Sequence, residues 1–144
     1  MTKDITSANA SATLIMDLFP AGIKLEQFSA DGAWSQDGYA VLETRMGVDG
    51  YMAAGYTPVE KEVTFHFQAN SPSISKLNLV WQTMETAKTA LWCNIIITVP
   101  SIGMIYTCAN GVLMNYKMLP NAEKVLEPID ATFRFESITA VPMT

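Results

Sequence analysis

The sequence predicts a mainly β, α+β domain in which antiparallel strands carry one flanking α-helix. Residues 62–69 and 129–138 alternate between apolar and polar side chains, a pattern typical of strands with one buried face and one solvent face. Apolar residues recur at steps of three and four over about residues 71–89, which predicts a single amphipathic helix. A chain of 144 residues is long enough for one sizeable core, so we expect residues 1–144 to form a single domain.

The N-terminal part is expected to be extended. Residues 1–13 are rich in Ala, Ser and Thr and predict an arm that runs into a first strand. Residues 20–22, Pro-Ala-Gly, are a turn signal, and a strand is expected after them over residues 23–29. A further short strand is expected over residues 39–44.

A glycine-rich segment then interrupts the strands at residues 45–58. It contains three glycines, two tyrosines and two methionines with no clear period. Irregular segments of this length are uncommon inside compact domains and are usually functional, and Tyr and Met are enriched at protein–protein interfaces. We therefore expect a protruding contact loop, with a strand interrupted by bulges as the alternative. The residues singled out are Gly47, Val48, Asp49, Gly50, Tyr51, Met52 and Tyr56.

The helix has a clear beginning and one apolar stripe. Ser71 is a suitable N-cap, and Pro72 fits the first helical position, where its missing N–H costs nothing. The core positions expected on the stripe are Leu77, Trp81 and Met84, together with Ile74. This stripe should pack on the protein's own sheet.

The remainder of the chain returns to strands. They are expected over residues 91–99, 104–109, 111–118 and 129–138. Residues 100–103 form the first turn between them. Asn110-Gly111, a strong hairpin dipeptide, predicts a second turn.

The sequence shows no pattern that points to catalysis, a metal or a cofactor. His66 is the only histidine, and no carboxylate or cysteine stands at ligand spacing within its own segment. Cys93 and Cys108 form neither a zinc pattern nor a redox motif, and we expect buried thiols. Glycine-rich phosphate loops and nucleophile elbows are absent from the sequence. We expect no enzyme; the alternative is a site whose residues converge from distant positions.

The composition favours a protein that buries surface against partners. Charged residues make up 16% of the chain, against about 25% in typical soluble domains; a neutral polar exterior is the alternative explanation. A net charge of −5 argues against a sequence-reading nucleic-acid binder. No signal-peptide pattern opens the chain, and no apolar run approaches the ~20 residues of a membrane span. We expect synthesis in the cytoplasm and no membrane anchoring.

Four stretches of the chain resemble tail tube proteins of contractile-tailed bacteriophages. They are residues 46–51, 63–73, 119–128 and 133–136. The order of elements is also similar to that of a related protein, the haemolysin-coregulated tube protein of type VI secretion. The first 40 residues carry no matching motif.

The resemblance implies a β-sandwich or partial barrel with a helix at its side, in which residues 45–58 contact the next ring. It implies homohexameric rings that stack into an inner tail tube, a conduit for genome delivery. The implied partners are further copies of the chain and the sheath and baseplate proteins, while DNA passes without sequence-specific binding. The implied location is the virion tail, with the host cytoplasm during assembly. The alternatives are a tube-like baseplate or neck protein, a type VI-like tube subunit, and a monomeric small-ligand-binding β-barrel.

A ring would turn one polar sheet face towards its channel. The candidate lumen residues are Thr64, His66, Gln68, Thr132, Arg134 and Glu136, with Lys24 and Glu26 as a weaker set. A channel for DNA should not grip phosphates, so we expect a neutral to acidic lumen in which a neighbour such as Glu136 offsets Arg134. The competing interpretation places these faces on the exterior, against a sheath.

Overall fold

The computed structural model describes residues 10–29 and 32–143. The elements are β1 (Ser11–Met16), β2 (Phe19–Leu25), β3 (Trp34–Ser35), β4 (Leu42–Met46), β5 (Met52–Tyr56), β6 (Lys61–Phe67), α1 (Pro72–Ala87), β7 (Cys93–Val99), β8 (Met104–Tyr116) and β9 (Ile129–Pro142).

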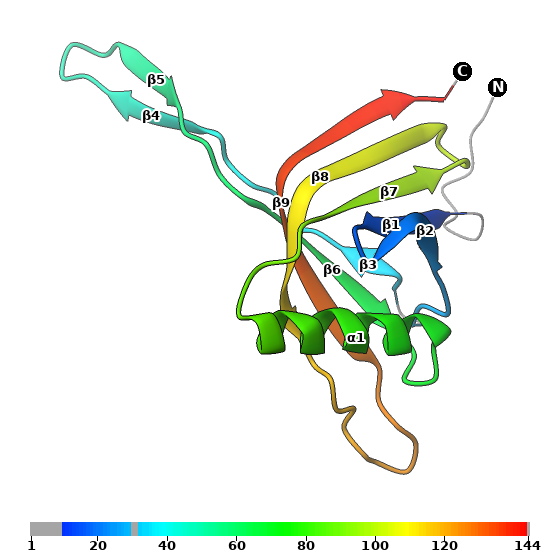
Figure 1. Ribbon diagram of the computed structural model, residues 1–144. Coiled ribbons are helices and arrows are strands. Elements are labelled where there is room, and N and C mark those ends of the chain that lie inside the picture. Colours follow the sequence, from blue (N-terminus) through cyan, green and yellow to red (C-terminus); the bar gives the residue numbers. More distant parts are fainter. Residues whose placement is uncertain (1–9, 30–31, 144) are drawn as a thin grey trace.

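Seven strands form one antiparallel sheet in the order β2-β1-β7-β8-β9-β6-β3, and β4 and β5 pair with each other. The large sheet curls into a partial barrel, and α1 lies across its lower part (Figure 1). This architecture confirms the predicted mainly β, α+β class with one helix.

The core depends on the pairing of β6 with β9. Val63 lies opposite Phe133, and Phe65 lies opposite Ala131. All four of these side chains are buried, and the rings of Phe65 and Phe133 meet edge to face at 5.7 Å between centroids. Aromatic side chains bury more apolar area than any other residue type. This ladder is therefore the centre of the hydrophobic core.

The helix is fixed at its N-terminus by two serines. The Ser71 hydroxyl accepts a hydrogen bond from the Ser73 N–H at 3.2 Å and donates one to the Glu26 carbonyl. The Glu26 N–H in turn donates to Ser73 Oγ at 2.9 Å. The first of these bonds satisfies a helix N–H group, and the other two join the start of α1 to the end of β2.

The apolar stripe of α1 faces the sheet. Leu77 is completely buried, together with Ile74 and Val80, while Trp81 and Met84 are partly buried against the core. The ring of Trp81 lies 6.0 Å from that of Tyr116, at the end of β8. The helix ends at Ala87 and is capped by Lys88, which adopts the left-handed conformation.

The predicted hairpin turn at Asn110-Gly111 is wrong, because β8 runs through it without interruption. Asn110 has a positive φ of 54°, and its N–H donates to Asn94 Oδ1 at 2.9 Å, where the register with β7 shifts. The dipeptide therefore forms a β-bulge. Gly111 packs against Phe135, and a Cβ at this position would collide with the Phe135 ring.

The predicted turn at residues 20–22 is also misplaced. Met16 pairs with Phe19, so the chain reverses at Asp17 and Leu18, and Pro20 lies within β2. Gly22 has a φ of 84° at an irregularity of the β1–β2 register. β2 is an edge strand and has a neighbour on one side only. A proline is tolerated in such a strand, because a backbone N–H on the free side has no partner strand to bind.

The expected arm at residues 1–13 is described only in part. Residues 1–9 lie outside the described residues. Residues 11–13 belong to β1, which is paired with β2 on one side and with β7 on the other.

Both cysteines are buried, and neither forms a disulfide. Burial raises the pKa of Cys93 to about 12 and that of Cys108 to about 11. Because the thiolate is the reactive form, we expect negligible alkylation of the native protein by iodoacetamide at pH 8. Both thiols should react once urea unfolds the chain. Rapid modification without urea, measured by mass spectrometry, would contradict this burial.

Leu77→Ala should destabilise the domain by about 2–5 kcal/mol, as cavity-forming core substitutions do. Leu79→Ala is the matched control, because Leu79 lies on the same helix and is 49% exposed; its effect should stay within about 0.5 kcal/mol. Urea denaturation followed by circular dichroism measures both. An equal loss of unfolding free energy in the two variants would show that the apolar stripe of α1 does not pack on the sheet.

Candidate assembly surfaces and the polar sheet face

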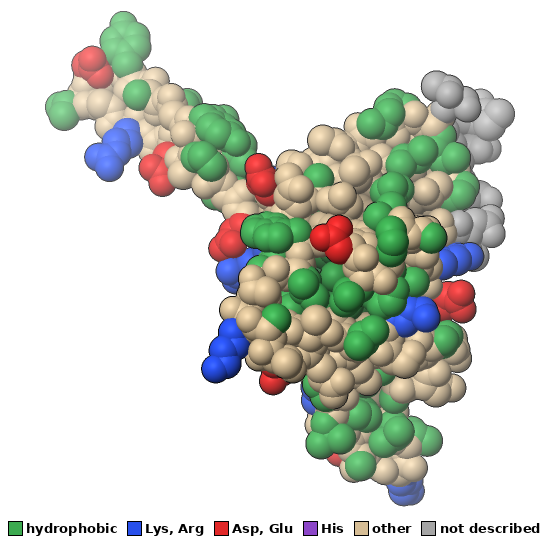
Figure 2. Space-filling view, viewed as in Figure 1, with side chains coloured by type: hydrophobic (Ala, Val, Ile, Leu, Met, Phe, Trp, Pro, Cys, Tyr) green, Lys and Arg blue, Asp and Glu red, His purple; other side chains and the backbone are tan. Residues whose placement is uncertain are grey.

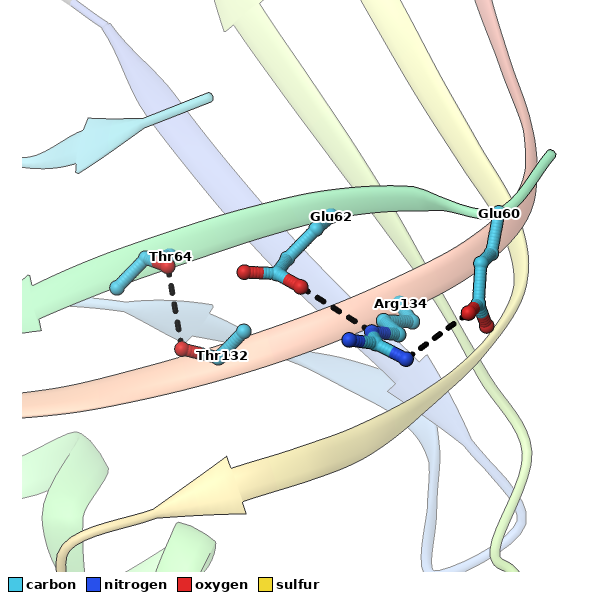
Figure 3. Close-up of polar contacts among 5 residues, drawn as sticks. All are labelled: Glu60, Glu62, Thr64, Thr132 and Arg134. Carbon is cyan, nitrogen blue, oxygen red and sulfur yellow. Dashed lines mark hydrogen bonds and ion pairs between the residues drawn. The ribbon is translucent and has the colours of Figure 1, made fainter. Parts of the chain in front are cut away.

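The two polar strand faces predicted from the sequence lie side by side on one surface. Thr64 pairs with Thr132 across β6 and β9, and their hydroxyl oxygens are 3.1 Å apart (Figure 3). Arg134 lies opposite Glu62 in the same register. This face is turned away from the phenylalanines of the core, because side chains alternate along each strand.

Arg134 lies between two carboxylates. Its Nη1 is 2.9 Å from Glu60 Oε1, and its Nε is 3.1 Å from Glu62 Oε2 (Figure 3). The expected partner Glu136 instead accepts a hydrogen bond from Asn110 Nδ2 at 3.3 Å. Ion pairs this exposed contribute little stability. Their effect is to orient Arg134 and to leave one net negative charge around it.

His66 has two side-chain partners that its own segment does not reveal. Its Nδ1 is 2.6 Å from Asp130 Oδ1, and its Nε2 is 3.2 Å from Ser35 Oγ. Asp130 is its cross-strand neighbour on β9, while Ser35 belongs to β3. Gln68, the remaining predicted residue of this face, is exposed just beyond the end of β6.

The segment predicted as a contact loop is largely a β-hairpin. Its strands pair from Leu42 with Tyr56 to Met46 with Met52. The Gly47 N–H closes the turn on the Tyr51 carbonyl at 2.7 Å, and the Tyr51 N–H donates to Asp49 Oδ1. The hairpin projects away from the partial barrel (Figure 1).

Large apolar side chains are exposed along this hairpin. They are Leu42, Met46, Val48, Tyr51, Met52 and Tyr56. Figure 2 shows several hydrophobic groups on the projection, with charged and other groups between them. A two-stranded hairpin is at best marginally stable alone in water, and apolar patches of this kind usually mark interfaces.

A second projection lies at the opposite end of the molecule. It comprises residues 117–128, and Leu119, Val125 and Leu126 are exposed on it (Figure 2). A short bridge between Ala122 and Leu126 shapes its tip. The molecule therefore exposes apolar groups at two ends that are not equivalent.

An apolar cavity of about 530 Å³ lies on the inner side of the sheet. Its walls include Val63, Ile97, Tyr106 and Ile138. None of the described residues that line it is charged. Within residues 10–29 and 32–143, no three His, Cys, Asp or Glu side chains gather closely enough to hold a metal ion.

The same described part of the chain has no helix long and apolar enough to cross a membrane.

Comparison with known proteins gives one family and several similar folds. The model of the family described as tail fiber protein gp32 matches residues 3–139. No curated protein matched the sequence.

Three solved structures are similar over almost their whole length. A chain of the anti-feeding prophage baseplate, 6-fold symmetrised, aligns with a TM-score of 0.63 and 11% identity, covering 100% of this chain and 99% of that one. A chain of the PVC sheath/tube terminator, from an extracellular contractile injection system, has a TM-score of 0.64 and 9% identity, with coverage of 98% and 99%. A chain of the PVC sheath–tube complex has a TM-score of 0.59 and 10% identity, covering 97% and 93%.

At such low identity, these three likenesses establish a shared fold. The family match spans nearly the whole chain and supports the predicted phage-tail character, though not specifically a tail tube. The chain belongs to the tail fiber protein gp32 family of phage-tail proteins.

Proposed function

We propose that this protein is a structural subunit that closes into hexameric rings, which stack into the inner tube of a phage tail. The observation that carries the proposal is the projecting β4–β5 hairpin with its exposed apolar side chains. Its strands pair only with each other among the described elements. A neighbouring subunit would supply the packing that the hairpin lacks.

The arrangement of the two projections favours head-to-tail stacking. Contacts between unlike surfaces generate rings or open stacks, whereas a two-fold contact pairs one surface with its own copy. The hairpin and residues 117–128 are unlike surfaces at different ends of the subunit. In this proposal the hairpin contacts the next ring, and residues 117–128 offer a further contact at the other end.

The hexameric state is proposed from the tail-tube resemblance and from the fold. One similar chain comes from a baseplate described as 6-fold symmetrised. In this proposal the polar face of β6 and β9 lines the channel. The positive charge of Arg134 on this face is neutralised by two carboxylates. A surface of this charge would let DNA pass without binding its phosphates.

A tube terminator or baseplate component is the second candidate. It is favoured by the similar folds in a PVC sheath/tube terminator and in the anti-feeding prophage baseplate. Negative-stain microscopy of the purified protein separates the two roles, since a tube subunit should form long tubes and a terminator should stop at single rings. A monomer on a sizing column would contradict both and favour a ligand-binding barrel.

Deleting residues 48–54 should leave a folded domain that no longer stacks, because the hairpin makes the contact between rings. Val48→Ser combined with Tyr51→Ser tests the apolar contact without shortening the chain, and we expect the same loss. Circular dichroism checks the fold, while microscopy and sedimentation measure assembly. Tubes of ordinary length in both variants would exclude the hairpin from the contact between rings.

Lysine substitutions at Thr64, Gln68 and Thr132 should make a channel that retains DNA, because each added cation can neutralise a phosphate. The charge-matched control carries lysines at Ser75, Gln82 and Thr86, which are exposed on α1. We expect slower genome ejection with intact sheath binding for the first variant only. Loss of sheath binding with normal ejection would place the polar face on the exterior.

A further inference from the structure

Three residues from distant parts of the sequence meet on neighbouring strands of the polar face. Ser35 lies on β3, His66 on β6 and Asp130 on β9, and these three strands are adjacent in the sheet. The Ser35 hydroxyl is 3.2 Å from His66 Nε2, and His66 Nδ1 is 2.6 Å from Asp130 Oδ1. We propose that Ser35, His66 and Asp130 form an acyl-transfer site that hydrolyses small carboxylic esters.

The order of the contacts assigns a role to each residue. The Asp130 carboxylate can only accept a hydrogen bond when ionised, so it holds the His66 proton on Nδ1. The lone pair of Nε2 then faces the Ser35 hydroxyl. A nucleophile, a base and a residue that orients the base are thus in hydrogen-bonding sequence, the arrangement by which serine hydrolases are recognised on unrelated folds.

The site is open to a small substrate. A shallow cavity of about 460 Å³ is lined by all three residues and by Trp34 and Pro128. Ser35 is exposed, whereas the His66 side chain is only 28% exposed. The base is therefore sheltered, and the attacking oxygen is accessible. A cavity this open suits a small acyl group, such as the acetyl ester of an alcohol.

The edge position of β3 also provides a hydrogen-bond donor. The His66 N–H donates to the Ala33 carbonyl at 2.9 Å. Since alternate residues of an antiparallel strand turn their N–H groups away from the partner strand, the N–H group of Trp34 is directed to the free edge of β3.

The reaction proceeds in two balanced steps. Ser35 Oγ attacks the ester carbonyl carbon while its proton moves to His66 Nε2; the carbon–oxygen bond to the alcohol breaks, and the departing oxygen takes that proton. Water then attacks the acyl group on Ser35 and gives a proton to Nε2. Release of the carboxylic acid returns the Ser35 oxygen, which recovers the proton.

The test uses the full chain and a fluorophosphonate probe, which forms an Oγ–P bond and releases fluoride. Peptide mass spectrometry should find one adduct, on Ser35. His66→Ala should slow labelling by about 100-fold or more, the usual contribution of a general base, and Asp130→Asn should slow it as well. Ser75→Ala is the control, because Ser75 is an exposed serine whose hydroxyl donates to the Pro72 carbonyl, and labelling should be unchanged.

Hydrolysis of p-nitrophenyl acetate gives a second readout, and Ser35→Ala should abolish the activity above background. The proposal is overturned if Ser35 carries no adduct, or if His66→Ala is labelled at the rate of the unmodified chain. Circular dichroism of each variant excludes unfolding as the cause of a loss. The variant lacking residues 48–54 should still be labelled, so this result does not depend on tube formation.

Discussion

The register between β6 and β9 is the constraint on which the rest of the structure depends. It places Phe65 and Phe133 together on the inner face, and on the outer face it sets Thr64 against Thr132. A slip of one residue would exchange the two faces of a strand. Core formation and the composition of the polar surface are therefore determined by one set of backbone hydrogen bonds.

This constraint separates the body of the protein from its projections. The partial barrel buries its own apolar residues with α1, whose N-terminus is held to β2 through Ser71 and Ser73. Among the described positions, the hairpin contributes no residue to the core, and residues 117–128 contribute only Met118, which is partly buried against it. The exposed apolar side chains of the two projections can therefore change with little effect on the buried core.

Local patterns in the sequence predicted the helix and the alternating strands, because Ser71, Pro72 and the strand alternation act within a few residues. The sequence could not predict contacts set by long-range pairing. Asn110-Gly111 has the chemistry of a turn, yet its neighbours on β7 and β9 keep it within a strand. The same limit explains why Glu136 was expected beside Arg134 and why the partners of His66 were missed. Ser35 and His66 are 31 positions apart in the sequence, and His66 and Asp130 are 64 positions apart.

The close approach of Gly111 to the Phe135 ring has an evolutionary consequence. Any side chain at residue 111 would displace the Phe135 ring from the core. Substitutions at residues 111 and 135 must therefore be coupled. Proteins that share only about a tenth of their residues with this chain have a similar fold. A small residue facing a bulky ring at the bulge of β8 should therefore persist after most other sequence similarity has been lost.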